Sequence, residues 1–463
     1  MSRPLDLAEL LAEGSPVLGL AEAFRARGHE LYLVGGSVRD AWLRRAHEDL
    51  DFATDATPNE SKKIVRPLAS GVWLQGEAFG TVGAEIEGLR MEITTFRTER
   101  YQPASRHPTV QFASDIETDL SRRDFTINAM AVRLPEKTAV DPFNGVEDLR
   151  AKLIKTPLDP TVSFSDDPLR MLRAFRFASQ LDLQIDDGVL RAVEGLRDAI
   201  KTVSFERIRD ELAKLVTGKA PARALEIAEG TGLTQHFLPE LSSLKLEQDP
   251  VQRHKDVFHH TLAVMERTEP ILELRLAAVL HDIGKPKTRR IDKDGVSFHH
   301  HEVVGAQMAA QRLRALRFPN EVVATVSEVI RLHHRFHTYR LGWSDSAVRR
   351  YVRDAGPLLP TLNAMVRADC TTRNTAKAKE LGRRMDELEE RIKELAAQEE
   401  LDRIRPDLDG RQVMELLSIP PGPLVGVAMD FLMELRLDEG PLGVETAARR
   451  LQEWWRERPS PGA

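Results

Sequence analysis

The sequence contains one cysteine, Cys370, so the chain cannot form an intrachain disulfide. Its first residues, MSRPLDLAELLAEGS, lack the basic and then apolar pattern of a secretory signal. Apolar runs are short as well, and Leu276–Leu280 is far below the length of a membrane-spanning helix. These absences predict a protein of the reducing cytoplasm that has no membrane partner.

The sequence also lacks an excess of basic residues. Its formal net charge is −6, so nucleic acid would be attracted by local basic surface rather than by the chain as a whole. Hydrophobic residues make up 41% and charged residues 30%, which is typical of folded globular proteins. With 463 residues, the chain is long enough for two to four domains. Composition indicates neither a substrate nor an oligomeric state.

Short apolar runs separated by turns dominate the first part of the chain. Leu31–Val34, Thr81–Ile86 and Met91–Phe96 have the composition and alternation of strands. From about Asp141 onward, apolar residues recur at helical spacing, as in Phe205–Val216. The sequence therefore predicts a unit of sheet and helices followed by a helical body.

The C-terminal part has the marks of long helices. Segment 373–405 is rich in charge, and its apolar positions alternate at spacings of four and three: Leu381, Met385, Leu388, Ile392 and Leu395. This is the seam of a coiled-coil-like helix, whose partner could be another helix of the same chain. Ile419–Gly426 predicts a tight turn between two helices. Trp454 and Trp455 could stack on a nucleotide or pack in the core.

A pair of glycines, Gly35 and Gly36, follows a predicted strand and opens a predicted helix. Small residues at such a place let backbone N–H groups approach phosphate oxygens, and Arg39 could add positive charge. An ordinary tight turn is the alternative interpretation.

Two carboxylates, Asp49 and Asp51, lie two residues apart on a predicted strand and so face the same side. Like charges side by side favour a bound cation. Oxygen ligands next to a phosphate site suit Mg²⁺, and a pair of ions could activate a hydroxyl and stabilise leaving pyrophosphate. Glu92 is either a third carboxylate of this site or a solvated residue on a strand face.

Arg122, Arg123 and Asp124 precede another apolar segment. The arginines could bind the β- and γ-phosphates of a nucleotide, and the carboxylate could accept a hydrogen bond from a ribose hydroxyl. A salt-bridged loop is the alternative.

The chain resembles the class II tRNA nucleotidyltransferase and bacterial poly(A) polymerase superfamily. The resemblance rests on ordered motifs over roughly the first half of the chain: GGSVRD, DLDFAT, RRDFTINAM, DPFNGVEDL, DDPLRMLRAFRFA and SFERIRDEL. It implies that Asp49 and Asp51 are catalytic and hold Mg²⁺. It also implies a set of nucleotide-binding residues: Gly35, Gly36, Arg39, Arg123, Asp124, Asn128, Asp167, Arg170 and Arg173.

Asp167 and Arg170 lie three residues apart on a predicted helix and share a face. A carboxylate can accept from the exocyclic amine of adenine or cytosine, while a guanidinium donates to the neighbouring ring nitrogen. Guanine and uracil present the reverse pattern, so this pair would select A and C without a template. Arg173 continues the same face toward base or phosphate. The alternatives are a helix cap for Asp167 and an exposed helix position for Arg173.

Two departures from the resembling family concern this selection. The family normally has Glu where this sequence has Asp166. Residues 97–112 correspond to the loop with which the family completes AMP addition, and they lack the usual Asp-Gly after the first arginine. Their nearly usual length favours CCA or A-only addition over CC-only addition.

Histidines concentrate in the second half of the chain. A His-Asp pair after an apolar run, with a histidine before it and an aspartate well after it, matches the HD phosphohydrolase pattern. The implied ligands are His260, His281, Asp282 and Asp369, and His301 and His333 fit a two-metal version. These donors suit manganese, nickel, cobalt or zinc, which could activate water for attack on a phosphodiester. The alternative is a body domain that keeps residual ligands and mainly holds tRNA.

The resemblances together imply an α+β fold. Its parts would be a polymerase-β-like nucleotidyltransferase head of mixed sheet and helices (1–140), an all-α neck that recognises the nucleotide (141–235), an HD-type helical body (236–375) and a helical, tRNA-binding tail (376–463).

The predicted function is template-independent addition of CMP and AMP, or AMP alone, from CTP and ATP to the 3′ end of tRNA, with contacts to the acceptor stem. A CC-adding enzyme or a poly(A) polymerase is the alternative within this class. From another class, the alternative is an HD metal-dependent phosphodiesterase acting on 2′,3′-cyclic phosphates. An RNA-binding module without catalysis would not need the carboxylate pair Asp49 and Asp51.

Overall fold

The computed structural model describes residues 7–45, 49–73, 80–100, 109–112, 115–246, 256–292, 295–338, 343–370, 375–399, 401 and 404–458. The chain forms two compact units, Met1–Pro239 and Glu240–Ala463. The first contains the predicted head and neck, and the second contains the predicted body and tail. The finer division into four parts remains a prediction. Within the described residues, no helix has both the length and the apolar character needed to cross a bilayer.

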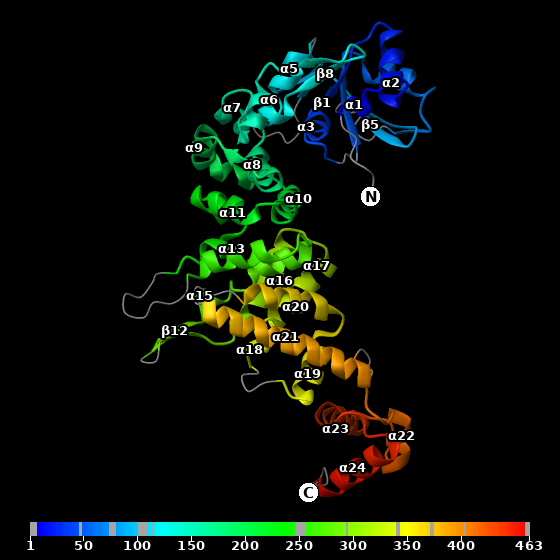
Figure 1. Ribbon diagram of the computed structural model, residues 1–463, viewed down its shortest axis with the longest axis vertical. Coiled ribbons are helices and arrows are strands. Elements are labelled where there is room, and N and C mark those ends of the chain that lie inside the picture. The colour runs from blue at the N-terminus through cyan, green and yellow to red at the C-terminus, as the bar shows by residue number, and fades with distance from the viewer. Residues whose placement is uncertain are drawn as a thin grey trace. The chain divides into compact units, whose positions relative to one another are not determined.

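A mixed sheet forms the centre of the head (Figure 1). Its described strands lie in the order β3 (Gly71–Trp73), β4 (Thr81–Ile86), β5 (Leu89–Thr95), β2 (Asp49–Thr54), β1 (Leu31–Val34), β8 (Ala131–Leu134) and β9 (Thr138–Val140). Strands β2 and β5 run parallel, whereas the other neighbours are antiparallel. All of β1 is buried because it lies inside the sheet. The predicted strands are present, although β5 begins two residues before Met91 and ends at Thr95.

Helices accompany this sheet and continue the first unit beyond it. They are α1 (Leu7–Leu10), α2 (Pro16–Arg25), α3 (Gly36–Trp42), α4 (Pro58–Val65), α5 (Ile116–Ser121), α6 (Gly145–Arg150), α7 (Pro160–Asp166), α8 (Leu169–Leu181), α9 (Asp187–Leu196), α10 (Phe205–Val216), α11 (Pro221–Gly230) and α12 (Pro239–Ser242), which crosses the unit boundary. Two short strand pairs add to them: β6 (Arg97–Arg100) with β7 (Thr109–Phe112), and β10 (Leu153–Ile154) with β11 (Gln184–Ile185).

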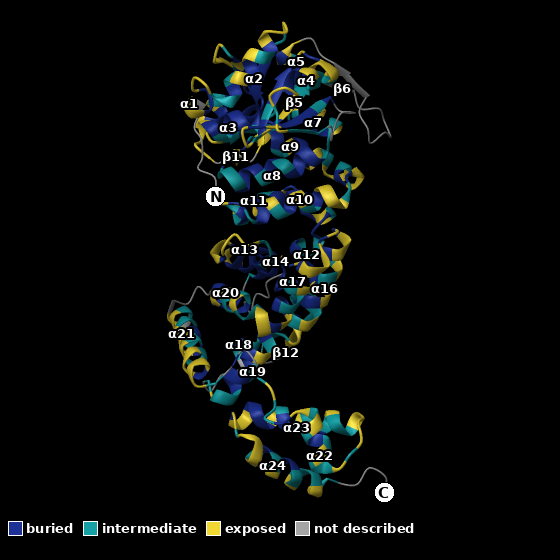
Figure 2. Ribbon diagram, turned by 90° about the vertical axis from the view of Figure 1, so that its right-hand side faces the viewer, coloured by how far each residue is buried: buried dark blue, intermediate teal, exposed yellow. Residues whose placement is uncertain are grey.

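Helix α8 is central to the helical part of the first unit because it packs against α10 and α11. The Asp167 carboxylate accepts the backbone N–H of Leu169 at 3.1 Å, and Pro168 stands between them at the start of the helix. The helix ends at Asp182, which adopts the left-handed conformation. Its apolar face is buried, as Figure 2 shows.

The second unit is mainly helical. Its elements are α13 (Val257–Arg267), α14 (Leu272–Leu280), α15 (Lys285–Thr288), β12 (Arg289–Asp292), β13 (Gly295–Phe298), α16 (His301–Ala315), α17 (Asn320–Leu332), α18 (Arg335–Thr338), α19 (Asp345–Ala355), α20 (Leu359–Asp369), α21 (Thr375–Gln398), α22 (Gly410–Leu417), α23 (Pro423–Glu439) and α24 (Val444–Glu457). The antiparallel ribbon of β12 and β13 was not expected from the sequence.

The predicted heptad seam lies on α21. Met385, Leu388 and Leu395 are buried, and Leu381 and Ile392 are half-buried. Helix α19 of the same chain packs against α21, so the partner is intramolecular. A turn does separate α22 and α23, but it ends at Gly422, and residues 423–426 of the expected turn Ile419–Gly426 belong to α23.

Trp454 and Trp455 pack against the core of the tail. The Trp454 ring stacks on that of Phe431, with centroids 4.3 Å apart and planes 8° apart. These contacts favour the core interpretation of the tryptophan pair over stacking on a nucleotide.

Candidate active site and metal centre

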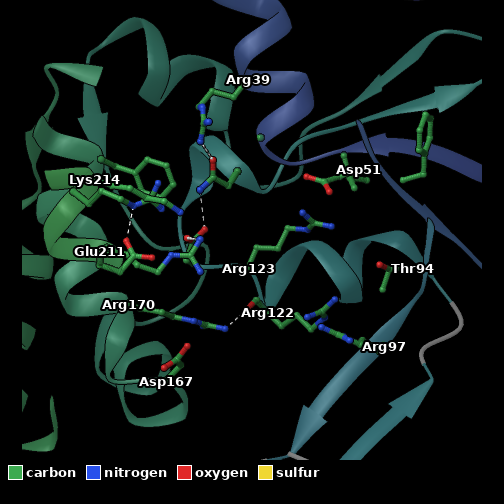
Figure 3. A pocket seen from close by; sticks show the side chains of 18 residues that line it. Arg39, Asp51, Thr94, Arg97, Arg122, Arg123, Asp167, Arg170, Glu211 and Lys214 are labelled. Carbon is green, nitrogen blue, oxygen red and sulfur yellow. Dashed lines mark hydrogen bonds and ion pairs between the residues drawn. The ribbon is translucent and has the colours of Figure 1, made fainter. Parts of the chain in front are cut away.

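A cavity of about 690 Å³ opens in the first unit between the sheet and helices α5, α8 and α10. Figure 3 shows Asp51 on the strand side and Asp167 and Arg170 on the helix side. Eight cationic and four acidic side chains line it: Arg39, Arg97, Arg122, Arg123, Arg170, Arg173, Arg176 and Lys214, with Asp51, Asp124, Asp167 and Glu211. This local surplus of positive charge suits an anionic ligand despite the negative net charge of the chain.

The cavity brings together most of the predicted nucleotide site. Gly36 and Asn128 also line it, while Gly35 lies beside it at the end of β1. Asp49 is an exposed residue at the outer end of β2.

Three carboxylates stand on one face of the sheet. Asp49 and Asp51 are two residues apart on β2, and the register places Glu92 of β5 directly beside Asp51. Burial raises the pKa of Asp51 to about 6, with Arg123 opposing the rise and Glu92 and Asp49 adding to it. A divalent cation would relieve this repulsion, so the donor set fits Mg²⁺.

Gly35 makes room for an arginine. Its φ is +68°, in the left-handed region that favours glycine. A Cβ at this position would lie 2.5 Å from Nη1 of Arg123, which is closer than a real side chain tolerates. Gly35 therefore serves the placement of Arg123 in the cavity, in addition to shaping the turn.

We expect Gly35→Ala to raise the KM for the nucleotide about tenfold, because the new Cβ displaces Arg123 and removes a charge-assisted contact to phosphate. Gly28→Ala is the matched control, since Gly28 has φ of +81° but nothing within 4 Å of its Cβ position. Both variants should lose about 1 kcal/mol of stability from backbone strain. Steady-state kinetics and thermal melting check this, and equal KM values for the two variants would contradict it.

Asp119 of α5 holds the two predicted phosphate-binding arginines. Its carboxylate is 1% exposed, and its two oxygens lie 2.5 Å from Nη2 of Arg122 and 3.1 Å from Nη2 of Arg123. Burial raises the pKa of Asp119, but Arg123 and Arg122 outweigh it and hold the pKa below its usual range. A charged Asp119 thus fixes both guanidinium groups at the cavity.

Asp124 is buried and already engaged by neighbouring groups. One oxygen lies 2.8 Å from Nη2 of Arg173, and the other accepts from the side-chain amide of Asn128 at 2.9 Å. The carbonyl oxygen of the Asn128 side chain accepts in turn from Arg39. In the structure, Asp124 orients these three residues, and the predicted contact of Asp124 with a ribose stays a prediction.

The predicted base-reading pair is held by neighbouring protein groups. Beyond its cap on α8, Asp167 accepts from Nη2 of Arg207 at 2.8 Å. Arg170 donates to Ser163 and to the backbone carbonyl of Arg122. Asp167 therefore fulfils the helix-cap interpretation and lines the cavity as well.

Four charged residues of the cavity were not named from the sequence: Arg97, Arg176, Glu211 and Lys214. Arg176 Nε lies 2.6 Å from Glu211 Oε2, and its guanidinium covers the Phe177 ring at 3.6 Å from the centroid. The pKa of Arg176 is lowered to about 10, chiefly because the side chain is buried; Glu211 opposes this fall and Arg173 adds to it. The three-residue spacing from Arg170 to Arg173, continued once more, could have identified Arg176.

A second cluster lies in the second unit, where α13, α14, α16, α17 and α20 meet. Each of two groups has ligand atoms within 4.8 Å of one another: His260 with His281 and Asp369, and Asp282 with His301 and His333. His260 Nε2 is 2.8 Å from Asp369 Oδ1, and His281 Nε2 is 3.2 Å from Asp282 Oδ2. The structure thus brings together all six residues that the HD pattern suggested.

The imidazoles of this cluster are oriented by the backbone. Nδ1 of His281, His301 and His333 each lies 2.5–2.9 Å from the carbonyl oxygen three residues earlier. With Nδ1 donating, each Nε2 carries the lone pair that a metal needs. Burial, and next His281, lower the pKa of His333 to about 3, so that ring is neutral.

Within the part of the chain that the structure describes, His281 Nε2 and Asp282 Oδ1 are buried and make ion-pair contacts, at 3.2 Å to Asp282 Oδ2 and 3.6 Å to His301 Nε2, but no hydrogen bond of good geometry. Such atoms are costly unless a ligand satisfies them. The other oxygen of Asp282 accepts from Lys285 Nζ at 2.6 Å. A transition metal fits this mixed set of imidazole and carboxylate donors.

Comparison with known proteins agrees with this geometry. The poly(A) polymerase head domain matches residues 31–155, and the HD domain matches residues 257–400. Between them, residues 182–245 match a family described as "Probable RNA and SrmB- binding site of polymerase A".

Two curated relatives illustrate the similarity. An A-adding tRNA nucleotidyltransferase of Deinococcus radiodurans is 33% identical over 93% of this chain and 96% of its own length. A CCA-adding enzyme of Bacillus licheniformis is 42% identical, but the match covers 49% of this chain and 56% of that enzyme.

Solved structures share the fold. The CCA-adding enzyme of Bacillus stearothermophilus in complex with CTP has a TM-score of 0.67 at 25% identity, covering 95% of this chain and 96% of that one. The CCA-adding enzyme of Thermotoga maritima complexed with tRNA has a TM-score of 0.63 at 19% identity, covering 98% and 100%. Fold and site thus define a head of the poly(A) polymerase type joined to an HD body. The chain belongs to the tRNA nucleotidyltransferase family.

Proposed function

We propose that the protein transfers CMP and AMP, or AMP alone, from CTP and ATP to the 3′ end of tRNA without a template. The observation that carries this proposal is the cationic cavity with Asp51 on one wall and Asp167 and Arg170 on the other. In the reaction, the 3′-hydroxyl of the RNA attacks the α-phosphorus, and pyrophosphate leaves.

In this proposal, Arg122 and Arg123 bind the β- and γ-phosphates, and Asp119 keeps both guanidinium groups in place. Asp49 and Asp51 hold Mg²⁺, which when bound supplies activation of the hydroxyl and neutralisation of the pyrophosphate charge. Gly35 leaves the space that Arg123 needs.

In this proposal, Asp167 and Arg170 select the base. Both side chains are fixed before a nucleotide binds, so they present one acceptor and one set of donors to the incoming base. Adenine and cytosine match that pattern, whereas guanine and uracil leave both groups unpaired.

AMP addition is the part of the reaction common to CCA-adding and A-adding enzymes. The A-adding relative aligns over nearly the whole chain, which supports AMP as a substrate. The middle of the loop that was expected to bear on this choice, residues 101–108 of 97–112, lies outside the described residues.

For tRNA, we propose that the helical second unit holds the acceptor stem, as the T. maritima enzyme is complexed with tRNA. A cytoplasmic location stays a prediction from the sequence.

The test compares substrates of different shape. The protein is incubated with labelled ATP and either a tRNA that ends in CC or an unstructured RNA that has the same terminal sequence. We expect label on the tRNA alone. Equal labelling of both RNAs would indicate a poly(A) polymerase, and no labelling of either would overturn the proposal.

A second candidate activity rests on the two adjoining groups of buried imidazole and carboxylate ligands. We propose that the six-residue cluster holds manganese, nickel, cobalt or zinc and hydrolyses 2′,3′-cyclic phosphates. A bound metal would activate water for attack on the phosphodiester. Lys285, 2.6 Å from Asp282, orients that carboxylate within the cluster.

A further inference from the structure

Two nitrogens of the Arg170 guanidinium are held by hydrogen bonds. Its Nη1 donates to the hydroxyl of Ser163 at 2.9 Å, and its Nη2 donates to the backbone carbonyl of Arg122 at 2.7 Å. Ser163 lies on α7 and is 5% exposed, and Arg170 on α8 is 8% exposed. In Figure 3 the contact between Arg170 and Arg122 is drawn at the edge of the cavity.

A guanidinium is planar and rigid, so fixing two of its nitrogens fixes the direction of the remaining N–H groups. Those groups are the ones left to meet a base in the cavity, which Arg170 lines. The carboxylate of Asp167 is held as well, by the N–H of Leu169 and by Arg207. Neither half of the pair depends on the nucleotide for its orientation.

We propose that Ser163 is a positioning residue that sets the base selectivity of the enzyme by orienting Arg170. This inference rests on the proposed nucleotidyl transfer. Discrimination against guanine and uracil requires a directed donor that those bases cannot satisfy. When the Ser163 hydroxyl is lost, the guanidinium is held by the Arg122 carbonyl alone and can turn away from a mismatched base. The free-energy penalty for binding guanine or uracil then becomes smaller.

A second cavity beside Ser163 shapes the choice of variants. It measures about 200 Å³ and is lined by Thr118, Ser121, Ser163 and Arg170, among others. This space can take one extra methyl group, so Ser163→Thr should keep the hydroxyl acceptor without overpacking.

The experiment measures kcat/KM for all four nucleotides with Ser163→Ala. We expect the ratio of ATP to GTP, and of CTP to UTP if CMP is added, to fall about tenfold, since one hydrogen bond to a charged group is lost. Ser163→Thr should restore the wild-type ratios. Ser165→Ala is the matched control, because Ser165 is an exposed residue on the same helix whose hydroxyl donates to Thr161.

Melting temperatures separate this role from a purely structural one. A structural role would lower the melting temperature and kcat for every nucleotide and leave the ratios unchanged, which would overturn the inference. Equal changes in Ser163→Ala and Ser165→Ala would overturn it too. If the wild-type protein incorporates no nucleotide into tRNA, the proposed function fails. Normal incorporation with unaltered ratios in Ser163→Ala overturns the inference alone.

Discussion

Replacing Asp51 with alanine is expected to lower nucleotide transfer on the order of a thousandfold and to leave tRNA binding nearly intact. The Asp51 carboxylate lines the cavity, Glu92 of β5 lies beside Asp51 in the sheet register, and Asp49 lies two residues away on β2. Stabilisation of the developing charge acts on the transition state and contributes little to ground-state binding of RNA. The measurement is kcat at saturating nucleotide together with the Kd for tRNA.

Glu85→Ala is the control for removing an acid from this sheet. In the sheet register, Glu85 of β4 is paired with Arg90 of β5, and Arg90 is paired with Asp49 of β2. Glu85 therefore lies on the same face of the sheet as Asp49, two strands away from it. Removing the Glu85 carboxylate should leave kcat within about twofold of the wild-type value, as for most surface substitutions. Near-normal transfer by Asp51→Ala, or an equal loss in Glu85→Ala, would contradict the assignment of Asp51.

The second large effect concerns the cluster in the second unit. The double variant His281→Ala, Asp282→Ala should lose the bound transition metal and all hydrolysis of 2′,3′-cyclic AMP, because one residue of each ligand group is removed. Nucleotide transfer should persist, since its residues lie in the first unit. Metal analysis, hydrolysis and transfer are measured on the same preparation.

His299→Ala, His300→Ala removes two exposed imidazoles near the same cluster and serves as the matched control. It should keep both the metal and the hydrolysis. If the wild-type protein binds no metal and hydrolyses nothing when manganese, nickel, cobalt and zinc are each supplied, the histidines are structural and the second candidate function is wrong.

Sequence patterns predicted the features that depend on neighbours in the chain. Strand β1 with its glycine turn, the shared face of Asp49 and Asp51, and the helix that carries Arg170 all follow from local spacing. Asp167 was expected on that helix as well, but it lies before Pro168 with an extended backbone, between α7 and α8. The fold class and the nucleotidyltransferase family are confirmed.

Contacts between distant segments could not be predicted in this way. The parallel register of β2 and β5, which sets Glu92 beside Asp51, depends on how the strands pair. Ser163 meets Arg170 only because α7 and α8 pack side by side. Periodicity shows which face of an element is apolar, but not which element that face meets.

The grouping of the histidines was also beyond sequence reasoning. His260, His281, Asp282 and Asp369 were expected as one set, but Asp282 groups with His301 and His333 in the structure. Asp282 also lies near His281, so the two groups adjoin. Residue order along the chain does not show which side of a shared carboxylate each imidazole faces.

The central claim is best tested by sequencing the products of single-nucleotide reactions. Three forms of one tRNA, ending at the discriminator base, at C and at CC, are each incubated with the protein and one nucleotide triphosphate at a time. The proposal predicts that ATP adds one A to the form ending in CC, and that GTP and UTP add nothing to any form. Addition of C to the shorter forms would identify a CCA-adding enzyme, and its absence an A-adding one. Efficient addition of G or U, or no addition of A to the form ending in CC, would contradict the account.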